Sequence, residues 1–277
     1  MLCDWAQIKV LQERHLNPIY VEEVNFFGLH EFEAYYASKS PQQYCIAVEQ
    51  PTVTLGRIVD GMPKCHDWRK DEDQLCRYIS MVCTVLRVLG KALRYVHQQD
   101  VIHGNVSLDT SGKFGENWKL MSITGIKRKG EEFQRTRFGE NSPPEAVQFV
   151  RDEFDPMNAL RETRAVFRPS IVAEPTFDIW SFGKLCYEAL TGEALFPFDP
   201  TKDAGEDVNT MKILGEWNEE RVKVAVSRLL TLGVTAPGAD LVSQCLSPKK
   251  DDRPQNMDEV LKHPFWYSQA KKTATYK

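Results

Sequence analysis

The chain contains no apolar run long enough to span a bilayer. Its first residues, Met1-Leu2-Cys3-Asp4-Trp5, lack the basic and then apolar layout of a signal peptide. Basic residues are not in excess, because the net charge is -4 at pH 7, so no general surface for nucleic acid or anionic lipid is implied. The seven cysteines form no C-x-x-C pair, which argues against a thiolate metal site or a disulfide framework. We therefore expect a cytoplasmic protein with reduced thiols and no membrane or nucleic-acid partner.

The apolar residues are numerous enough for a complete core. The 277 residues are 42% hydrophobic, which suits one large domain or two small ones. The first 50 residues have a mixed pattern, which predicts a helix over Trp5–Leu16 and strands over Val21–Phe32 and Tyr44–Glu49. The sequence Ser38-Lys39-Ser40-Pro41 is typical of the turn between these strands. A small mixed segment is therefore expected before a larger body.

Helical patterns dominate the rest of the chain, so the predicted fold class is α+β. Between residues 73 and 98, apolar residues recur at steps of four and three, which places them on one stripe of a long helix. They are Leu75, Ile79, Val82, Leu86, Leu89, Leu93 and Val96. Further helices are predicted over residues 177–190, 221–232 and 239–246, and residues 257–266 are expected to close the fold.

One segment between these helices is polar and basic. Thr124–Asn141 contains three glycines and no apolar period, so a mobile surface loop is predicted there. Its basic part, Lys127–Arg137, is a candidate docking surface for a protein partner. A solvated loop without a binding role is the preferred interpretation.

Several short motifs follow one another along the chain. They are His103–Thr110, Ser122-Ile123-Thr124, Pro143-Pro144-Glu145, Asp178–Gly183, and Asp252-Arg253-Pro254 with His263-Pro264-Phe265. In this order they resemble the catalytic loop, the metal-binding triplet, the Ala-Pro-Glu motif, the Asp-x-Trp-Ser-x-Gly helix start and the closing segment of the protein kinase superfamily. The resemblance covers about residues 44 to 266. Each motif alone is weak, but their order indicates the fold of that family.

The resemblance implies a protein-kinase-like two-lobe fold. The small lobe would be a truncated one at residues 1–50, the mainly helical large lobe would span 51–270, and 271–277 would be a frayed tail. Glu49 and Gln50 stand at the hinge positions. No G-x-G-x-x-G segment precedes His103, and the first three strands of a small lobe are absent or lie upstream of Met1. We expect the sequence to be truncated there.

The departures from the kinase pattern fall on the residues that carry its chemistry. Asn105 stands at the position of the general base, and Ser107 stands at that of the phosphate-contacting lysine. Thr110 and Ser122 stand at the two metal-binding positions, and Gly104 replaces an arginine that commonly receives an activation-loop phosphate. An amide cannot accept the proton of a substrate hydroxyl, and a neutral hydroxyl is a poor ligand for Mg²⁺. The resemblance therefore implies the family's fold without its reaction.

The residues that the family uses as scaffold are retained. By resemblance, Glu145 should form a bidentate ion pair with Arg253. Asp178 should accept hydrogen bonds from the backbone at His103. His103 and Ile123 should stack in an apolar spine with a residue of the first helix. These are structural roles, and none requires catalysis.

Three functions remain open. Loss of catalytic residues with retention of scaffold residues favours a pseudokinase, a protein kinase domain-containing signalling protein that acts by binding or scaffolding a protein partner. The alternative is an active or weak ATP-dependent protein serine/threonine kinase. A third possibility is a kinase-derived remnant with no function by itself. No cofactor is expected under the first reading, whereas ATP and Mg²⁺ are expected under the alternative. Ser107 leaves serine/threonine or tyrosine ancestry open.

Overall fold

The computed structural model of the chain describes residues 32–36, 44–48, 50–61, 71–121, 125–133, 140–146, 171–196 and 208–267. For residues 32–36, 44–48 and 208–211 it describes the backbone alone. Helices and short antiparallel strands both occur, so the fold class is α+β, as predicted. The predicted helix Trp5–Leu16 lies outside the described residues.

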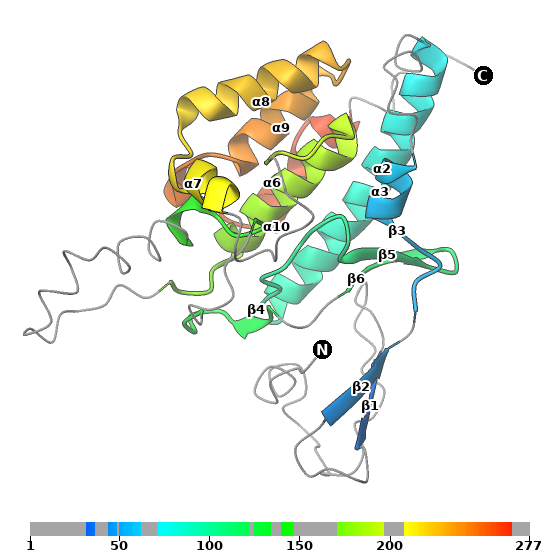
Figure 1. Ribbon diagram of the computed structural model, residues 1–277, viewed down its shortest axis with the longest axis vertical. Coiled ribbons are helices and arrows are strands. Elements are labelled where there is room, and N and C mark those ends of the chain that lie inside the picture. Colours follow the sequence, from blue (N-terminus) through cyan, green and yellow to red (C-terminus); the bar gives the residue numbers. More distant parts are fainter. Residues whose placement is uncertain are drawn as a thin grey trace, which may run out of the picture.

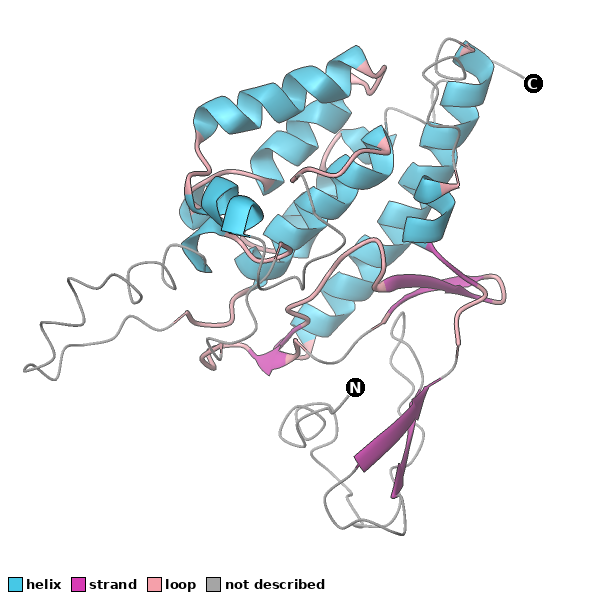
Figure 2. Ribbon diagram, in the orientation of Figure 1, coloured by secondary structure: helices cyan, strands magenta, loops and turns pink. Residues whose placement is uncertain are grey.

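The helices form the main body, and the short strands lie along one side of it (Figure 2). The described helices are α2 (Leu55–Asp60), α3 (Glu72–Gln98), α6 (Pro175–Thr191), α7 (Val208–Gly215), α8 (Glu219–Thr231), α9 (Ala236–Cys245), the 3-10 helix η3 (Lys250–Asp252) and α10 (Met257–Lys262). Helix α6 packs against α3, α8 and α9, while α10 packs against α3 (Figure 1). The three helices predicted after residue 170 are confirmed as α6, α8 and α9 with shifted ends, whereas α2 and α7 were not predicted.

Helix α3 is the long helix that the apolar stripe predicts. Asp71 begins it, because its carboxylate accepts hydrogen bonds from the N–H groups of Asp73 and Gln74. Six residues of the stripe are buried, and Leu75 is partly buried against the same core. The helix ends just before the turn that leads into the loop at His103. The stripe therefore fixes both the helix and the place where that loop begins.

Helix α6 lies at the centre of the helical body. Every residue from Thr176 to Thr191 is buried, so its surroundings are protein on all sides. Trp180 meets the Trp217 ring edge to face, with the ring centroids 5.4 Å apart. Gly192 ends the helix in the left-handed conformation, with φ 72°, which a glycine adopts without steric cost. A buried helix of this kind can position charged groups only if each has a partner.

The described strands are short and form three antiparallel sheets. They are β1 (Phe32–Tyr36), β2 (Tyr44–Val48), β3 (Val53–Thr54), β4 (Val101–Ile102), β5 (Ser111–Phe114), β6 (Asn117–Leu120) and β7 (Lys127–Arg128). β1 pairs with β2, the order β3-β5-β6 makes the second sheet, and β4 pairs with β7. Strand β6 follows the loop at His103 and β5, and it packs against α3. The second predicted strand of the first segment is β2.

One prediction about local structure is wrong, and another falls almost entirely outside the described residues. The strand β1 is Phe32–Tyr36, whereas the predicted strand Val21–Phe32, apart from Phe32, and the predicted turn Ser38-Lys39-Ser40-Pro41 lie outside the described residues. The segment predicted as a mobile loop contains β7 and a bridge between Glu132 and Val172. The buried Ile126 fixes the start of this segment.

The described helices and cysteines bear on the predictions of no membrane span and of reduced thiols. Within the described residues, no helix combines the length and apolarity needed to cross a membrane. Cys76 is exposed, whereas Cys83, Cys186 and Cys245 are buried, and all four are free thiols. Burial raises the pKa of both Cys83 and Cys245 to about 12. These buried thiols are therefore un-ionised core side chains rather than nucleophiles.

Candidate functional site

The candidate site is the loop His103–Thr110, which runs from β4 to β5 and begins on a buried carboxylate. Asp178, at the start of α6, is fully buried. One of its oxygens accepts the N–H of His103 at 2.7 Å, and the other accepts the N–H of Gly104 at 2.7 Å. The hydrogen bond predicted between Asp178 and the loop backbone is thus present. Two charge-assisted bonds to adjacent N–H groups fix the loop to the central helix.

Two histidines complete the surroundings of this carboxylate. Nε2 of His97, in the last turn of α3, lies 2.9 Å from Asp178. The His103 ring is fully buried, and its Nε2 lies 3.0 Å from the carbonyl oxygen of Met121. A carbonyl accepts only, so Nε2 of His103 carries the proton, and Nδ1 accepts the N–H of Asn105 at 3.3 Å. His103 is therefore a neutral imidazole with both nitrogens satisfied.

A pH dependence follows from the buried His103 ring. Burial lowers the pKa of His103, against the opposing effects of the Asp178 charge and the Met121 carbonyl. The unfolded chain therefore binds the proton more readily, so stability is full above the ordinary histidine pKa of about 6.5 and falls below it. We expect His103 to contribute a loss of up to about 1.4 kcal/mol per pH unit.

Urea unfolding between pH 7.5 and 5.0 measures this loss. The variant His103→Gln keeps a donor for Met121 but cannot titrate, so its stability should fall less steeply with pH. A ¹⁵N titration of the His103 ring should also find its pKa below the ordinary histidine value. Equal slopes in both proteins, or a ring that titrates at or above the ordinary value, would contradict the assignment.

The second residue of the loop is held by a close backbone contact. Gly104 has φ 70°, a conformation that favours glycine. A Cβ atom on Gly104 would overlap the carbonyl of Gly125, and a Cβ atom on Gly125 would lie 2.7 Å from the carbonyl carbon of Gly104. The chain after β6 therefore passes directly against the loop. An arginine at position 104 would clash, which explains why a glycine stands there.

The hydroxyl groups of Ser107 and Thr110 bind one another inside the loop. The Thr110 hydroxyl donates to the carbonyl of Asn105 at 2.7 Å and accepts the N–H of Ser107 at 2.8 Å. The two hydroxyl oxygens are 3.1 Å apart, and the Ser107 oxygen accepts the N–H of Thr110 at 3.2 Å. Because the Thr110 proton goes to Asn105, Ser107 is the donor between the hydroxyls. The one donor and two acceptor sites of the Thr110 hydroxyl are then all used.

Asn105 is connected to the centre of α6 through a polar chain. Its side-chain oxygen accepts a hydrogen bond from Asn141 Nδ2 at 3.3 Å. The oxygen of the same Asn141 amide accepts from Lys184 Nζ at 3.0 Å. Lys184 in turn pairs with Glu188 at 2.8 Å, and the two side chains are 4% and 7% exposed. The residue at the base position is thus held by a network whose positive end is a buried ammonium.

The buried pair of Lys184 and Glu188 has further polar neighbours. Burial raises the pKa of Glu188 above its ordinary value, although the charge and hydrogen bond of Lys184 oppose the shift. Glu188 also accepts the N–H of Leu195 at 3.2 Å, and Glu140 lies 3.8 Å from Lys184. Sequence reasoning missed this network. Its signal was a Lys and a Glu four residues apart within an apolar helix, where both must be buried and paired.

The second scaffold contact joins the turn at Glu145 to the segment after η3. Both Glu145 carboxylate oxygens accept from Arg253, each at 2.8 Å. The predicted bidentate ion pair is thus present. Arg253 also donates to the carbonyls of Ser247 at 2.8 Å and Pro248 at 3.2 Å, and its guanidinium lies 5.0 Å from the centre of the Trp180 ring. This buried cation ties the end of the chain to α6.

The structure brings together part of the predicted site. His103, Asn105, Ser107 and Thr110 share one loop, which Asp178 anchors. Glu145 and Arg253 form a separate contact. Gln50 is an exposed residue between β2 and β3. The predicted residues Glu49, Ser122 and Ile123 lie outside the described residues.

The residues at the loop do not fit a Mg²⁺ ion. Thr110 offers neither a carboxylate nor a free lone pair, and Asp109 is the exposed carboxylate of the loop. In the described ranges, no group of three or more His, Cys, Asp or Glu side chains is placed to hold a metal ion. Within the described residues, the polar groups of the loop form a hydrogen-bonded network with one another and with Asp178.

The chain was compared with known proteins. It matches no model of a protein family and no curated protein.

Proposed function

We propose that the chain has a protein-kinase-like two-lobe fold and acts as a pseudokinase, which binds or scaffolds a protein partner without transferring phosphate. In this proposal residues 1–50 belong to a small lobe, with Glu49 and Gln50 at the hinge, and residues 51–270 form the large lobe. Its support is the order of the motifs together with two contacts between distant segments. These are the Asp178 contact to the loop at His103 and the ion pair of Glu145 with Arg253.

The observation that carries the proposal is the closed hydrogen-bond network of the loop. The hydroxyls of Ser107 and Thr110 satisfy each other and the loop backbone, and the Asn105 amide is held by Asn141. Phosphoryl transfer needs groups that neutralise the developing charge and position the phosphates. A loop whose polar groups already bind one another offers none of these. The same bonds keep the loop in one shape, which suits a binding surface.

Nucleotide binding tests the proposal most directly. The thermal stability of the purified chain is measured with ATP, with and without Mg²⁺. A ligand that binds only the folded chain at ~100 times its dissociation constant adds about 2.7 kcal/mol of stability. For a protein of this size that gain corresponds to a shift of roughly 5–10 °C in Tm. We expect no shift in either condition.

The other outcomes are equally definite. A Tm shift that requires Mg²⁺, followed by transfer of the γ-phosphate to a protein substrate, would overturn the proposal in favour of the ATP-dependent protein serine/threonine kinase. The control is the double variant Ser107→Ala with Thr110→Ala, which removes both hydroxyls. If the wild type binds Mg²⁺ and ATP through this loop, the double variant should lose the shift.

A further inference from the structure

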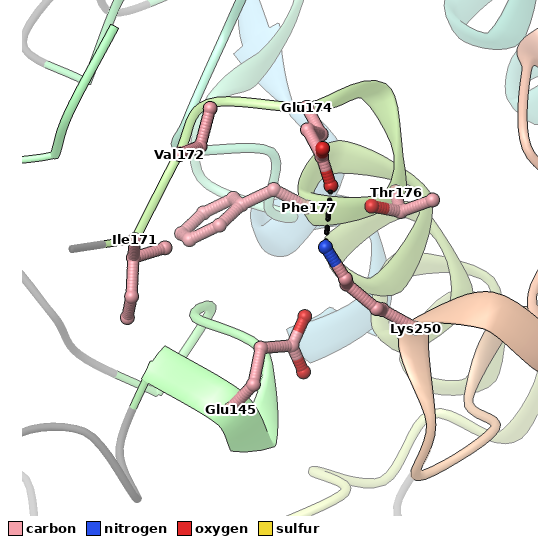
Figure 3. A pocket seen from close by; sticks show the side chains of 7 residues that line it. All are labelled: Glu145, Ile171, Val172, Glu174, Thr176, Phe177 and Lys250. Carbon is pink, nitrogen blue, oxygen red and sulfur yellow. Dashed lines mark hydrogen bonds and ion pairs between the residues drawn. The ribbon is translucent and has the colours of Figure 1, made fainter. Parts of the chain in front are cut away.

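A pocket of about 230 Å³ lies between the first turn of α6 and the turn that carries Glu145, outside the loop described above (Figure 3). Its lining combines three charged residues, one hydroxyl and three apolar side chains. They are Glu145, Glu174, Lys250, Thr176, Ile171, Val172 and Phe177. In Figure 3 these side chains surround an open centre, with Glu145 opposite Glu174. The pocket thus has a charged rim and an apolar wall.

The Lys250 ammonium is the cation that binds Glu174 at the rim of this pocket. Lys250 Nζ lies 3.0 Å from a Glu174 oxygen, and the two side chains are 49% and 41% exposed. The hydrogen bond that Lys250 donates to Glu174 raises the pKa of Lys250, and the charges of Glu174, Asp251 and Glu145 act in the same direction. Carboxylates therefore surround this ammonium. Since the pair is half exposed, it can open at little cost.

A buried hydroxyl adds a free polar group to the pocket. Thr176 is 5% exposed and lines the cavity. Its backbone carbonyl accepts from Arg253, whereas its hydroxyl forms no hydrogen bond within the described residues. In Figure 3 this hydroxyl points toward the ion pair of Glu174 and Lys250. The hydroxyl oxygen faces the pocket, so a donor group of a ligand can reach it.

The apolar wall is flat and firmly supported. The Phe177 ring stacks on Phe133, with the ring centroids 4.4 Å apart. Ile171 and the 40% exposed Val172 continue this wall toward the surface. A planar cation with an apolar stem suits such a wall, because its stem packs on aliphatic side chains and its face stacks on a ring.

We infer that this pocket binds an arginine side chain of a partner polypeptide, whose guanidinium replaces the Lys250 ammonium at Glu174. This inference rests on the proposed function, because it names the chemistry of the protein partner. A guanidinium carries five donors in a plane, so it can reach Glu174 and the Thr176 hydroxyl together, which an ammonium cannot do in the same geometry. An anionic ligand is disfavoured because Glu174 would repel it, whereas Glu145 is already paired with Arg253.

The test is an NMR titration of the ¹⁵N-labelled chain with a capped peptide, acetyl-Gly-Gly-Arg-Gly-Gly-amide. The matched peptide has citrulline in place of arginine, which keeps the shape and removes the charge. We expect saturable shifts of the Val172, Thr176 and Phe177 amide signals with the arginine peptide, and at least tenfold weaker binding of the citrulline peptide. Equal binding of both peptides, or no shift at these amides, would overturn the inference.

Two variants at the rim sharpen the result. Lys250→Ala removes the competing ammonium and should strengthen binding of the arginine peptide roughly two- to fivefold, the range set by an exposed ion pair. Glu174→Gln should weaken it by a similar factor, and since this side chain makes no capping bond to α6 the fold should persist. Lys223→Ala, which removes a similar exposed pair with Glu220 on α8, is the control and should change nothing. An unchanged affinity in both rim variants would sink the inference.

The peptide titration and the nucleotide experiment fail separately. Peptide binding is measured without ATP, so a missing shift at Thr176 rejects the arginine site and leaves the pseudokinase proposal as it stands. Conversely, Mg²⁺-dependent phosphate transfer rejects the pseudokinase and leaves the peptide result as a property of the pocket.

Discussion

Replacement of Arg253 by methionine should lower the free energy of unfolding by about 3–5 kcal/mol, the range for breaking a buried ion pair. The Arg253 side chain is fully buried, whereas Glu145 is 31% exposed and can turn to water, so the loss falls mainly on the carbonyls that the guanidinium holds. Glu145 would lose both hydrogen bonds, and the carbonyls of Ser247 and Pro248 would lose theirs. Methionine fills a similar volume against Trp180, so the loss would reflect the polar contacts rather than a cavity.

Urea unfolding followed by circular dichroism measures this effect. The matched control is Arg221→Met, which removes an exposed arginine that lies 3.4 Å from Glu216, and it should change stability by at most about 1 kcal/mol. Arg253→Lys should recover only part of the loss, because an ammonium cannot hold both carboxylate oxygens and two carbonyls in one plane. A loss under about 1 kcal/mol in Arg253→Met would show that the contact is not structural.

Helices α3 and α6 were predictable because each depends on its own sequence, whereas the short helices α2 and α7 were not predicted. The apolar stripe of α3 has a period that no strand shares, and the start at Asp71 and the stop near His97 are local signals. Helix α6 was equally clear, since its apolar run ends at the Gly192 breaker. Such elements are specified by residues within a few turns of one another.

The two-residue strand β7 could not be predicted in the same way. β7 is two basic residues, Lys127 and Arg128, and it is a strand only because β4 lies beside it. Two residues cannot display a period, and lysine and arginine have no preference for strands. Ile126, just before these two residues, is an isolated apolar residue in the sequence. It is buried only because distant parts of the chain cover it, and its own neighbours do not predict that.

Some contacts of the candidate site were also predictable from the sequence, and others were not. The contacts of Asp178 and of Glu145 were predictable because the motifs carried them by resemblance. The path from Asn105 through Asn141 to Lys184 was not, because it joins segments whose approach only the fold decides. The Ser107 and Thr110 bonds depend on the turn geometry of the loop, which residue types alone do not fix.

Removal of the Asp178 carboxylate should be as costly as the loss of Arg253, and its effect should be local in a way that can be observed. Asp178→Ala leaves the buried N–H groups of His103 and Gly104 without acceptors and removes the partner of His97. Each buried group without a partner costs about 1–3 kcal/mol, so we expect a loss of about 3–5 kcal/mol. Asp178→Asn should lose less, because one oxygen remains to accept.

Hydrogen exchange separates a local release of the loop from general destabilisation. Under native conditions the amides of His103 and Gly104 should exchange much faster in Asp178→Asn, relative to the decrease in global protection, because their acceptor is altered. The amides of Ser107 and Thr110 should follow the global change alone, since their acceptors are hydroxyls of the same loop. The control Asp258→Asn, at an exposed residue 3.4 Å from Arg94, should alter neither pair. If all four loop amides lost protection equally, the loop would depend on Asp178 throughout, and the self-contained network that argues against phosphate transfer would not exist.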